Sequence, residues 1–116
     1  RIWAVRMTLS ERIIAASTDA EAREVLEALW DLSPHAWSPK YAYREFSEMA
    51  GMESAASRMG AVMMLVDPAY FWAATMLGEN RVGFHACYLR EGAMEWIEAP
   101  TAWQALAAAI AKTREG

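Results

Sequence analysis

The chain has 116 residues and a mass of 13.0 kDa, the size of one domain with its own hydrophobic core. Apolar residues make up 55% of it, which excludes a disordered chain, and a net charge of −4 argues against a general nucleic-acid binder. Its single cysteine, Cys87, rules out an internal disulfide and fits a reducing cytoplasm. No apolar run approaches the roughly 18 residues of a membrane span, so we expect a cytoplasmic protein without a membrane partner.

Residues 1–6 precede Met7, and the sequence allows two interpretations of them. The run MTLSE from Met7 looks like a natural translation start, which would make residues 1–6 vector-derived or upstream sequence. The alternative is a short native β-arm, because three of the six residues are strand-prone. On either interpretation we treat residues 1–116 as a single domain.

Two capping signals predict the first two helices. Thr8 with Glu11, and Thr18 with Glu21, have the spacing of a capping box, in which both side chains satisfy orphan helix amides. The first helix should run to about residue 16. The second should stop before Ser33-Pro34, because a proline disfavours helical conformation in the residue before it. Apolar residues at helical spacing predict the buried face of the second helix: Ala22, Val25, Leu26, Leu29 and Trp30.

Two more helices are predicted on either side of Gly51. The third covers about residues 39–50 and begins at Ser38-Pro39. The fourth covers about residues 54–65, and its wide apolar face makes us expect it to be the central, buried helix. That face consists of Ala55, Met59, Val62, Met63 and Val66, widened by Met64 and Leu65.

From Asp67 onward the pattern favours strands. Residues 70–77 contain good helix formers, but their aromatic start and the following Gly-Glu-Asn favour a strand and a hairpin. Residues 82–89 and 94–98 are predicted as two further strands, paired antiparallel because their connections are short. The first two strands are apolar on both sides, so we expect the sheet to be covered on both faces.

A last helix from Thr101 should supply one of these covers. Thr101 and Gln104 form its capping signal, and its predicted buried residues are Trp103, Leu106, Ala107 and Ile110. We therefore predict an α+β fold with a mostly helical N-terminal half. Its core is a three-layer sandwich, in which a small three-stranded antiparallel sheet is covered by helices on both faces.

One pattern in the second half resembles a known family. Its first part is Ser57-x-x-x-Ala61-x-x-x-Leu65-Val66-x-Pro68-x-Tyr70-x-Trp72, and after a strand pair it continues as Ala99-Pro100-Thr101-Ala102-x-x-Ala105-Leu106. This is similar to small phage and prophage proteins with an ABA-sandwich domain. In that family a leading helix, a Leu-Val-Pro turn, a Trp-bearing strand and a hairpin precede an alanine-rich helix. The resemblance implies a phage or prophage context and the cytoplasm of a bacterial host, and it carries over no catalytic residue.

The residues able to support chemistry are few. His85 and Cys87 share a strand face, but a zinc site needs three or four ligands and only His35 adds another. A buried cysteine beside a hydrogen-bonded histidine is the simpler interpretation. Glu95 and Glu98 lie three residues apart on a strand, so they point to opposite faces and do not form a catalytic pair. With no phosphate loop, nucleophile elbow or paired-cysteine motif, we predict a non-enzymatic protein without metal or cofactor.

Two surface features favour protein binding. The second helix carries Asp19, Glu21, Glu24, Glu27 and Asp31, offset only by Arg23. Such a face suits a basic, nucleic-acid-binding partner, as in acidic phage inhibitors that mimic DNA phosphates, although a solvated helix face is the ordinary alternative. An aromatic segment follows, comprising Trp30, His35, Trp37, Tyr41 and Tyr43, and such residues anchor interfaces as well as cores. The predicted partner-binding residues are Glu21, Glu24, Glu27, Asp31, Trp37, Tyr41 and Tyr43.

We therefore predict a phage- or prophage-encoded binding protein, for example an inhibitor of a host defence component such as an anti-CRISPR. Its partner would be a host or defence protein, or a second copy of the chain, rather than nucleic acid. The alternative is a small helix-turn-helix-like DNA-binding regulator over residues 43–58, with Gly51 at the turn. That alternative would present Ser54, Ser57 and Arg58 to a groove, while Glu45, Glu48 and Glu53 would repel phosphates.

Overall fold

A computed structural model describes residues 7–33, 39–67, 71–76, 78, 83–90 and 93–115, with residues 39–41, 71–75, 88–90 and 93 described by their backbone alone. The elements follow in the order α2 (Leu9–Ala15), α3 (Asp19–Leu32), α4 (Pro39–Gly51), α5 (Ala55–Met63), β1 (Phe71–Met76), β2 (Phe84–Arg90), β3 (Ala93–Ala99) and α6 (Ala102–Glu115). The chain is thus α+β, as predicted, and it is mostly helical.

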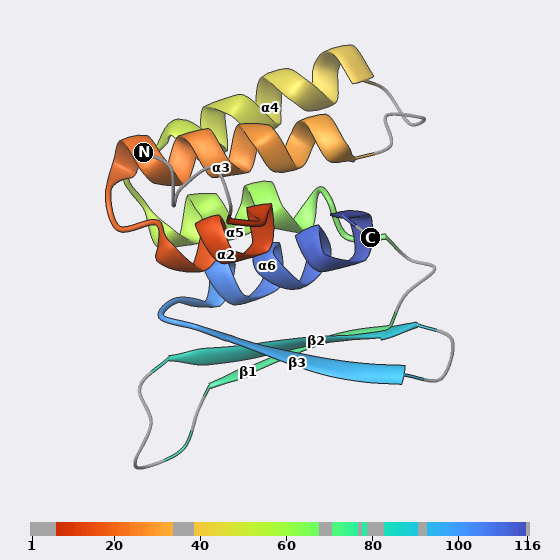
Figure 1. Cartoon of the computed structure of the whole chain (residues 1–116). Coiled ribbons are helices and arrows are strands. Elements are labelled where there is room, and N and C mark those ends of the chain that lie inside the picture. Colours follow the sequence, from red (N-terminus) through yellow and green to blue (C-terminus); the bar gives the residue numbers. More distant parts are fainter. Residues whose placement is uncertain are drawn as a thin grey trace.

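The described helices all lie on one side of the sheet (Figure 1). α3 and α4 form an outer layer, α2, α5 and α6 form a second layer, and α6 packs against all three strands. The prediction of helices on both faces is therefore not confirmed in the described part of the chain. The apolar pattern of the strands indicated that both faces need cover, but it did not indicate that all the helices would stack on the same side.

The sheet has the strand order β1-β2-β3, with antiparallel pairing throughout. For the predicted segment 70–77, the structure describes residues 71–76 as the strand β1, which favours the strand over the helix. β2 pairs with β3 in the register Ala86↔Ile97, so these two residues share a face of the sheet. Gly83 precedes β2 with a φ of 135°, a backbone conformation that favours glycine.

α6, and not the fourth helix, is the central helix of the fold. All nine residues from Trp103 to Ala111 are buried, because α2, α3, α5 and the sheet surround α6. Small alanine side chains let these neighbours approach closely. In α5 only Ala61 and Val62 are buried, while Ala55 and Met63 are exposed, so its expected central position was wrong.

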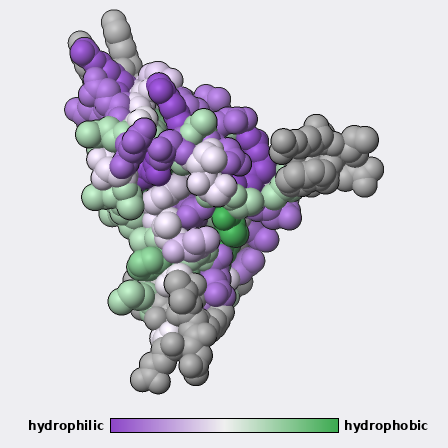
Figure 2. Space-filling model, turned by 90° about the vertical axis from the view of Figure 1, so that its left-hand side faces the viewer, coloured by the Kyte–Doolittle hydropathy of each residue, from purple (hydrophilic) through white to green (hydrophobic). Residues whose placement is uncertain are grey.

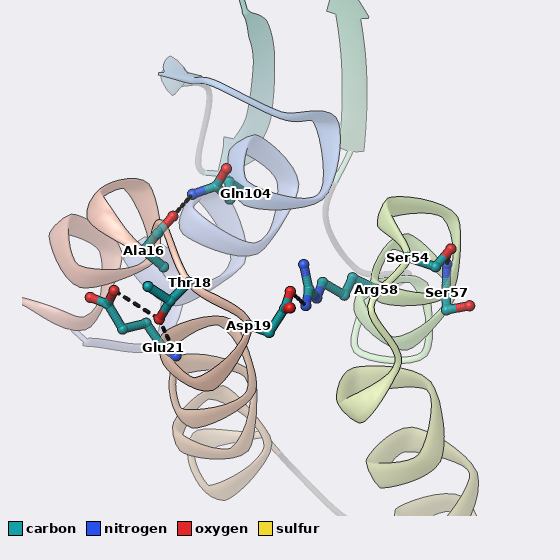
Figure 3. Close-up of polar contacts among 8 residues, drawn as sticks. All are labelled: Ala16, Thr18, Asp19, Glu21, Ser54, Ser57, Arg58 and Gln104. Carbon is teal, nitrogen blue, oxygen red and sulfur yellow. Dashed lines mark hydrogen bonds and ion pairs between the residues drawn. The ribbon is translucent and has the colours of Figure 1, made fainter.

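Buried polar side chains hold α2 against α6. Gln104, only 4% exposed, donates from Nε2 to the carbonyl oxygens of Ile13 at 2.9 Å and Ala16 at 2.8 Å, at the end of α2 (Figure 3). Ser10 Oγ donates to the carbonyl oxygen of Ala108 at 3.0 Å. These bonds satisfy the buried Gln104 amide and the buried Ser10 hydroxyl, which would otherwise lack these partners. They position the start of α3, where the acidic residues begin.

Candidate functional site

The acidic residues of α3 lie on its solvent side because its opposite side packs into the core. The predicted stripe from Ala22 to Trp30 is buried, while Glu21, Glu24 and Asp31 are exposed and Glu27 is half-buried. Thr18 caps the helix by accepting from the backbone N–H of Glu21 at 3.1 Å. Acidic residues in the first turn also complement the positive end of the helix dipole.

Some of these carboxylates are neutralised by arginines from neighbouring helices. Arg12 Nη2 lies 3.1 Å from Glu24 Oε1, and Arg58 Nη2 lies 2.5 Å from Asp19 Oδ1. Glu21 instead accepts from its own cap, Thr18 Oγ1, at 2.9 Å. Within the described residues, Glu21, Glu27 and Asp31 have no cationic partner. The unbalanced negative charge of α3 therefore includes the part of the helix that faces α4.

Glu27 joins the two features that the sequence indicated separately. Tyr43 Oη donates to Glu27 Oε2 at 2.9 Å, and Ser47 Oγ donates to Glu27 Oε1 at 3.2 Å. Both donors come from α4, so the carboxylate is fixed between the two helices and its orientation is set by two hydroxyl groups. Neither donor cancels its charge.

Tyr43 itself is held by an aromatic cluster. Its ring centroid lies 5.3 Å from that of Trp30, which in turn lies 4.9 Å from that of the fully buried Phe46. Trp30 is therefore a core residue, whereas Tyr43 remains 40% exposed. A tyrosine with one side packed and the other open to solvent is a suitable interface anchor. We call Glu27, Asp31, Tyr43 and Ser47 the acidic-aromatic surface.

The structure does not describe the side chains of the other two aromatic residues that were predicted to bind a partner. Trp37 lies outside the described residues, and Tyr41 lies in α4 with a side chain that is outside the description. Of the seven predicted partner-binding residues, the structure brings Glu27 and Tyr43 into direct contact. Ser47 was missed, because its role depends on how α3 and α4 dock. Its place four residues after Tyr43 on the same helix was the available signal.

The helix-turn-helix alternative required Arg58 to face solvent, and the structure places it inside. Its side chain is only 12% exposed and lies between α3 and α6, paired with Asp19 (Figure 3). Its guanidinium also lies 5.8 Å from the centroid of the Trp103 ring. Ser54 caps α5 by accepting from the backbone N–H of Ser57 at 3.3 Å. Arg58 could reach a DNA groove only by losing its contacts to Asp19 and Trp103.

A cavity of about 360 Å³ lies beside Arg58, and sequence reasoning did not anticipate it. It is lined by the α2–α3 connection and the start of α6, including Thr18, Asp19, Thr101, Trp103 and Gln104. Its charged pair, Arg58 and Asp19, is already mutually neutralised. We therefore interpret the cavity as a gap where helix ends meet, and the ion pair joins these ends.

The strand residues singled out for chemistry are held in packing and surface contacts. Cys87 is buried, the His85 ring lies 5.4 Å from that of Trp96, and Lys112 Nζ lies 3.7 Å from Glu95 Oε1. No group of three or more potential metal ligands gathers within the described residues. Among the described helices, none is long and apolar enough to cross a membrane.

No family model, curated protein or solved structure matches this chain.

Proposed function

We propose that this is a non-enzymatic binding protein whose acidic-aromatic surface contacts a basic protein. The observation that supports the proposal is the hydrogen bond between Glu27 and Tyr43, because Glu27 has no cationic partner among the residues that the structure describes and Tyr43 is half-exposed. A basic partner supplies the missing cation, and Tyr43 supplies an apolar contact next to it.

Preorganisation makes this surface more suitable than an ordinary solvated helix face. Glu27 is held by two hydroxyl groups and Tyr43 by the Trp30 ring, so binding orders few additional rotamers. An arginine of the partner could form a charge-assisted pair with Glu27 while stacking on Tyr43. DNA phosphates would be repelled by the same carboxylates, which favours a protein partner over nucleic acid.

The resemblance to phage and prophage proteins suggests what such a partner does. Host defence proteins that bind nucleic acid carry basic grooves, and an acidic surface can occupy such a groove in place of phosphates. We propose that the protein acts as an inhibitor of a host defence component of this kind. Such inhibition requires only binding through the acidic-aromatic surface, and it needs no catalytic group.

A charge-reversal comparison tests the proposal. The Glu27→Lys/Asp31→Lys variant and wild type are immobilised, and proteins captured from a bacterial host lysate are identified at several salt concentrations. We expect wild type to retain a basic protein, and we expect the variant to lose it. Capture should also weaken as the salt concentration rises, because surface charges are screened.

A matched control carries the same change in net charge elsewhere. Glu45→Lys/Glu53→Lys alters two exposed residues, and Glu45 lies about 200° around α4 from Tyr43 at about 100° per residue. The control should capture the same protein as wild type. If both variants lose the captured protein equally, the effect comes from net charge alone, and this result would contradict the proposal. Steeply salt-dependent binding of duplex DNA by wild type would instead favour the helix-turn-helix alternative.

A further inference from the structure

The two faces of the sheet differ sharply in their exposure. Ala86, Ile97 and Ala99 lie on the face that packs against α6, where they are at most 8% exposed and belong to the main core. Because side chains alternate along a strand, their neighbours His85, Trp96 and Glu98 point to the opposite side. No described helix lies on that side (Figure 1). We call it the open face, with His85, Cys87, Met94, Trp96 and Glu98 as its described side chains.

The open face is apolar at its centre. Trp96 is 47% exposed and Met94 is 54% exposed, two residues apart on the same strand. Cys87 is the cross-strand partner of Trp96, and it is buried without belonging to the core cluster on the α6 side. The His85 ring contacts that of Trp96, with centroids 5.4 Å apart, so the indole has a defined position on the sheet. Trp96 and Met94 together form apolar surface on this sheet face that a partner could bury.

We propose that a second copy of the chain covers the open face, so that two sheets pack face to face about a two-fold axis. Two sheets can pack face to face with their strands aligned, and a second copy supplies a sheet of matching size. The seven-residue strands β2 and β3 are about 23 Å long, and three strands spaced about 4.8 Å apart are about 14 Å wide. The face therefore has a projected area of about 300 Å². Stable interfaces bury about 800 Å² on each partner, so a face of this size supports only a weak dimer.

Charge also favours a second copy on this face rather than on another. The chain carries a net charge of −4, so two copies repel each other wherever acidic residues meet. Among its described side chains the open face carries one carboxylate, Glu98, and its cross-strand partner is His85. The helical end is different. Figure 2 shows mostly hydrophilic residues at that end and more hydrophobic ones toward the sheet.

This arrangement extends the proposed function without depending on it. α3 and α4 form the layer farthest from the sheet, so a dimer through the open faces leaves both acidic-aromatic surfaces uncovered at opposite ends (Figure 1). Such a dimer would be bivalent toward a basic partner, which raises avidity if both sites are reached. Loss of the dimer would leave each single acidic-aromatic surface intact.

Sedimentation velocity over a wide range of protein concentrations tests the proposal with a closely matched pair of variants. Met94→Glu and Met52→Glu make the same substitution at residues that are 54% and 53% exposed, but only Met94 lies on the open face. We expect wild type and Met52→Glu to shift from 13.0 kDa to twice that mass. Met94→Glu should dimerise at least about tenfold more weakly. A wild type that stays monomeric throughout, or equal effects of the two variants, would overturn the proposal.

A second measurement does not rely on a charged residue being tolerated in the sheet. Acrylamide quenching is compared between wild type and Trp96→Phe, and the difference reports on the Trp96 indole. Quenching of Trp96 should fall several-fold as the concentration rises through the dimerisation range. If the dimer forms while quenching of Trp96 stays constant, the interface lies elsewhere and the open face is not the dimer surface.

Discussion

The two faces of the β-sheet are made by the same strands but meet different surroundings. Ile97 and Trp96 are neighbours in β3, yet Ile97 is 8% exposed beneath α6 and Trp96 is 47% exposed on the open face. The strand sequence is apolar toward both sides, so it encodes a need for two covers. The chain supplies one of them itself through α6. An apolar strand pattern therefore predicts that both faces of the strand are buried, but it does not say whether the packing element belongs to the same molecule.

The largest expected effect comes from truncating one apolar side chain on each face. Ile97→Ala should reduce the free energy of unfolding by about 2–5 kcal/mol, because it leaves a cavity beneath α6. Met94→Ala should change it by no more than about 0.5 kcal/mol in dilute monomer, because its side chain is already half in water. Urea unfolding at low protein concentration measures both values. Equal losses would mean that the open face is covered within the monomer.

The next effect concerns the polar contacts that fix α6 in its central place. Gln104→Ala leaves the carbonyl oxygens of Ile13 and Ala16 without their buried donor, so we expect a loss of about 1–3 kcal/mol. Thr101→Ala removes the helix cap and the hydrogen bond that Thr101 Oγ1 donates to Gln104 Oε1 at 2.7 Å, while the Gln104 amide stays in place, and it should cost about 1 kcal/mol. Thermal unfolding followed by circular dichroism would compare the two. A smaller loss for Gln104→Ala than for Thr101→Ala would contradict the role assigned to Gln104.

The smallest expected effect on stability lies at the helical end. Tyr43→Phe removes one partly exposed hydrogen bond to Glu27, so the free energy of unfolding should fall by about 0.5 kcal/mol. Its effect on binding should be larger, because Glu27 loses the hydroxyl that orients it for a basic partner. Capture from lysate should weaken while the dimer is unchanged. Weaker dimerisation in Tyr43→Phe would mean that the two surfaces are not independent.

Local patterns were sufficient for most of the elements. The capping box of Thr8 and Glu11 is present, and the apolar stripe of α3 is buried as its spacing predicted. The strand in place of a helix at residues 71–76 was also predicted correctly, because its aromatic start and the glycine after it outweighed the alanines. These features depend on neighbours close in the chain, which is why the sequence reveals them.

The central helix could not be chosen from helical periodicity. The fourth helix has a wide face of large apolar residues, yet Met63 is 55% exposed, whereas the small alanines of α6 are buried on every side. A signal was present, since residues 105–111 of α6 include no polar residue, and a helix apolar all round is a buried one. Residue size on a single face was given too much weight.

The candidate site was predicted in its parts but not in its assembly. Glu27 and Tyr43 were each expected to bind a partner, but their hydrogen bond depends on how α3 and α4 dock. The helix-turn-helix alternative placed Arg58 in a DNA groove because of its position on α5, whereas its partner Asp19 lies 39 residues away in the chain. The exposure of Trp96 likewise depends on where every helix packs. Such contacts join residues that are far apart in the chain, so no short stretch of sequence predicts them.

The most direct test of the account is the mass of wild type, Met94→Glu and Met52→Glu in solution, measured by sedimentation velocity over the same concentration range. We expect wild type and Met52→Glu to reach twice 13.0 kDa while Met94→Glu remains largely monomeric. A wild type that stays at 13.0 kDa at every concentration, or a Met94→Glu variant that dimerises as well as wild type, would contradict it.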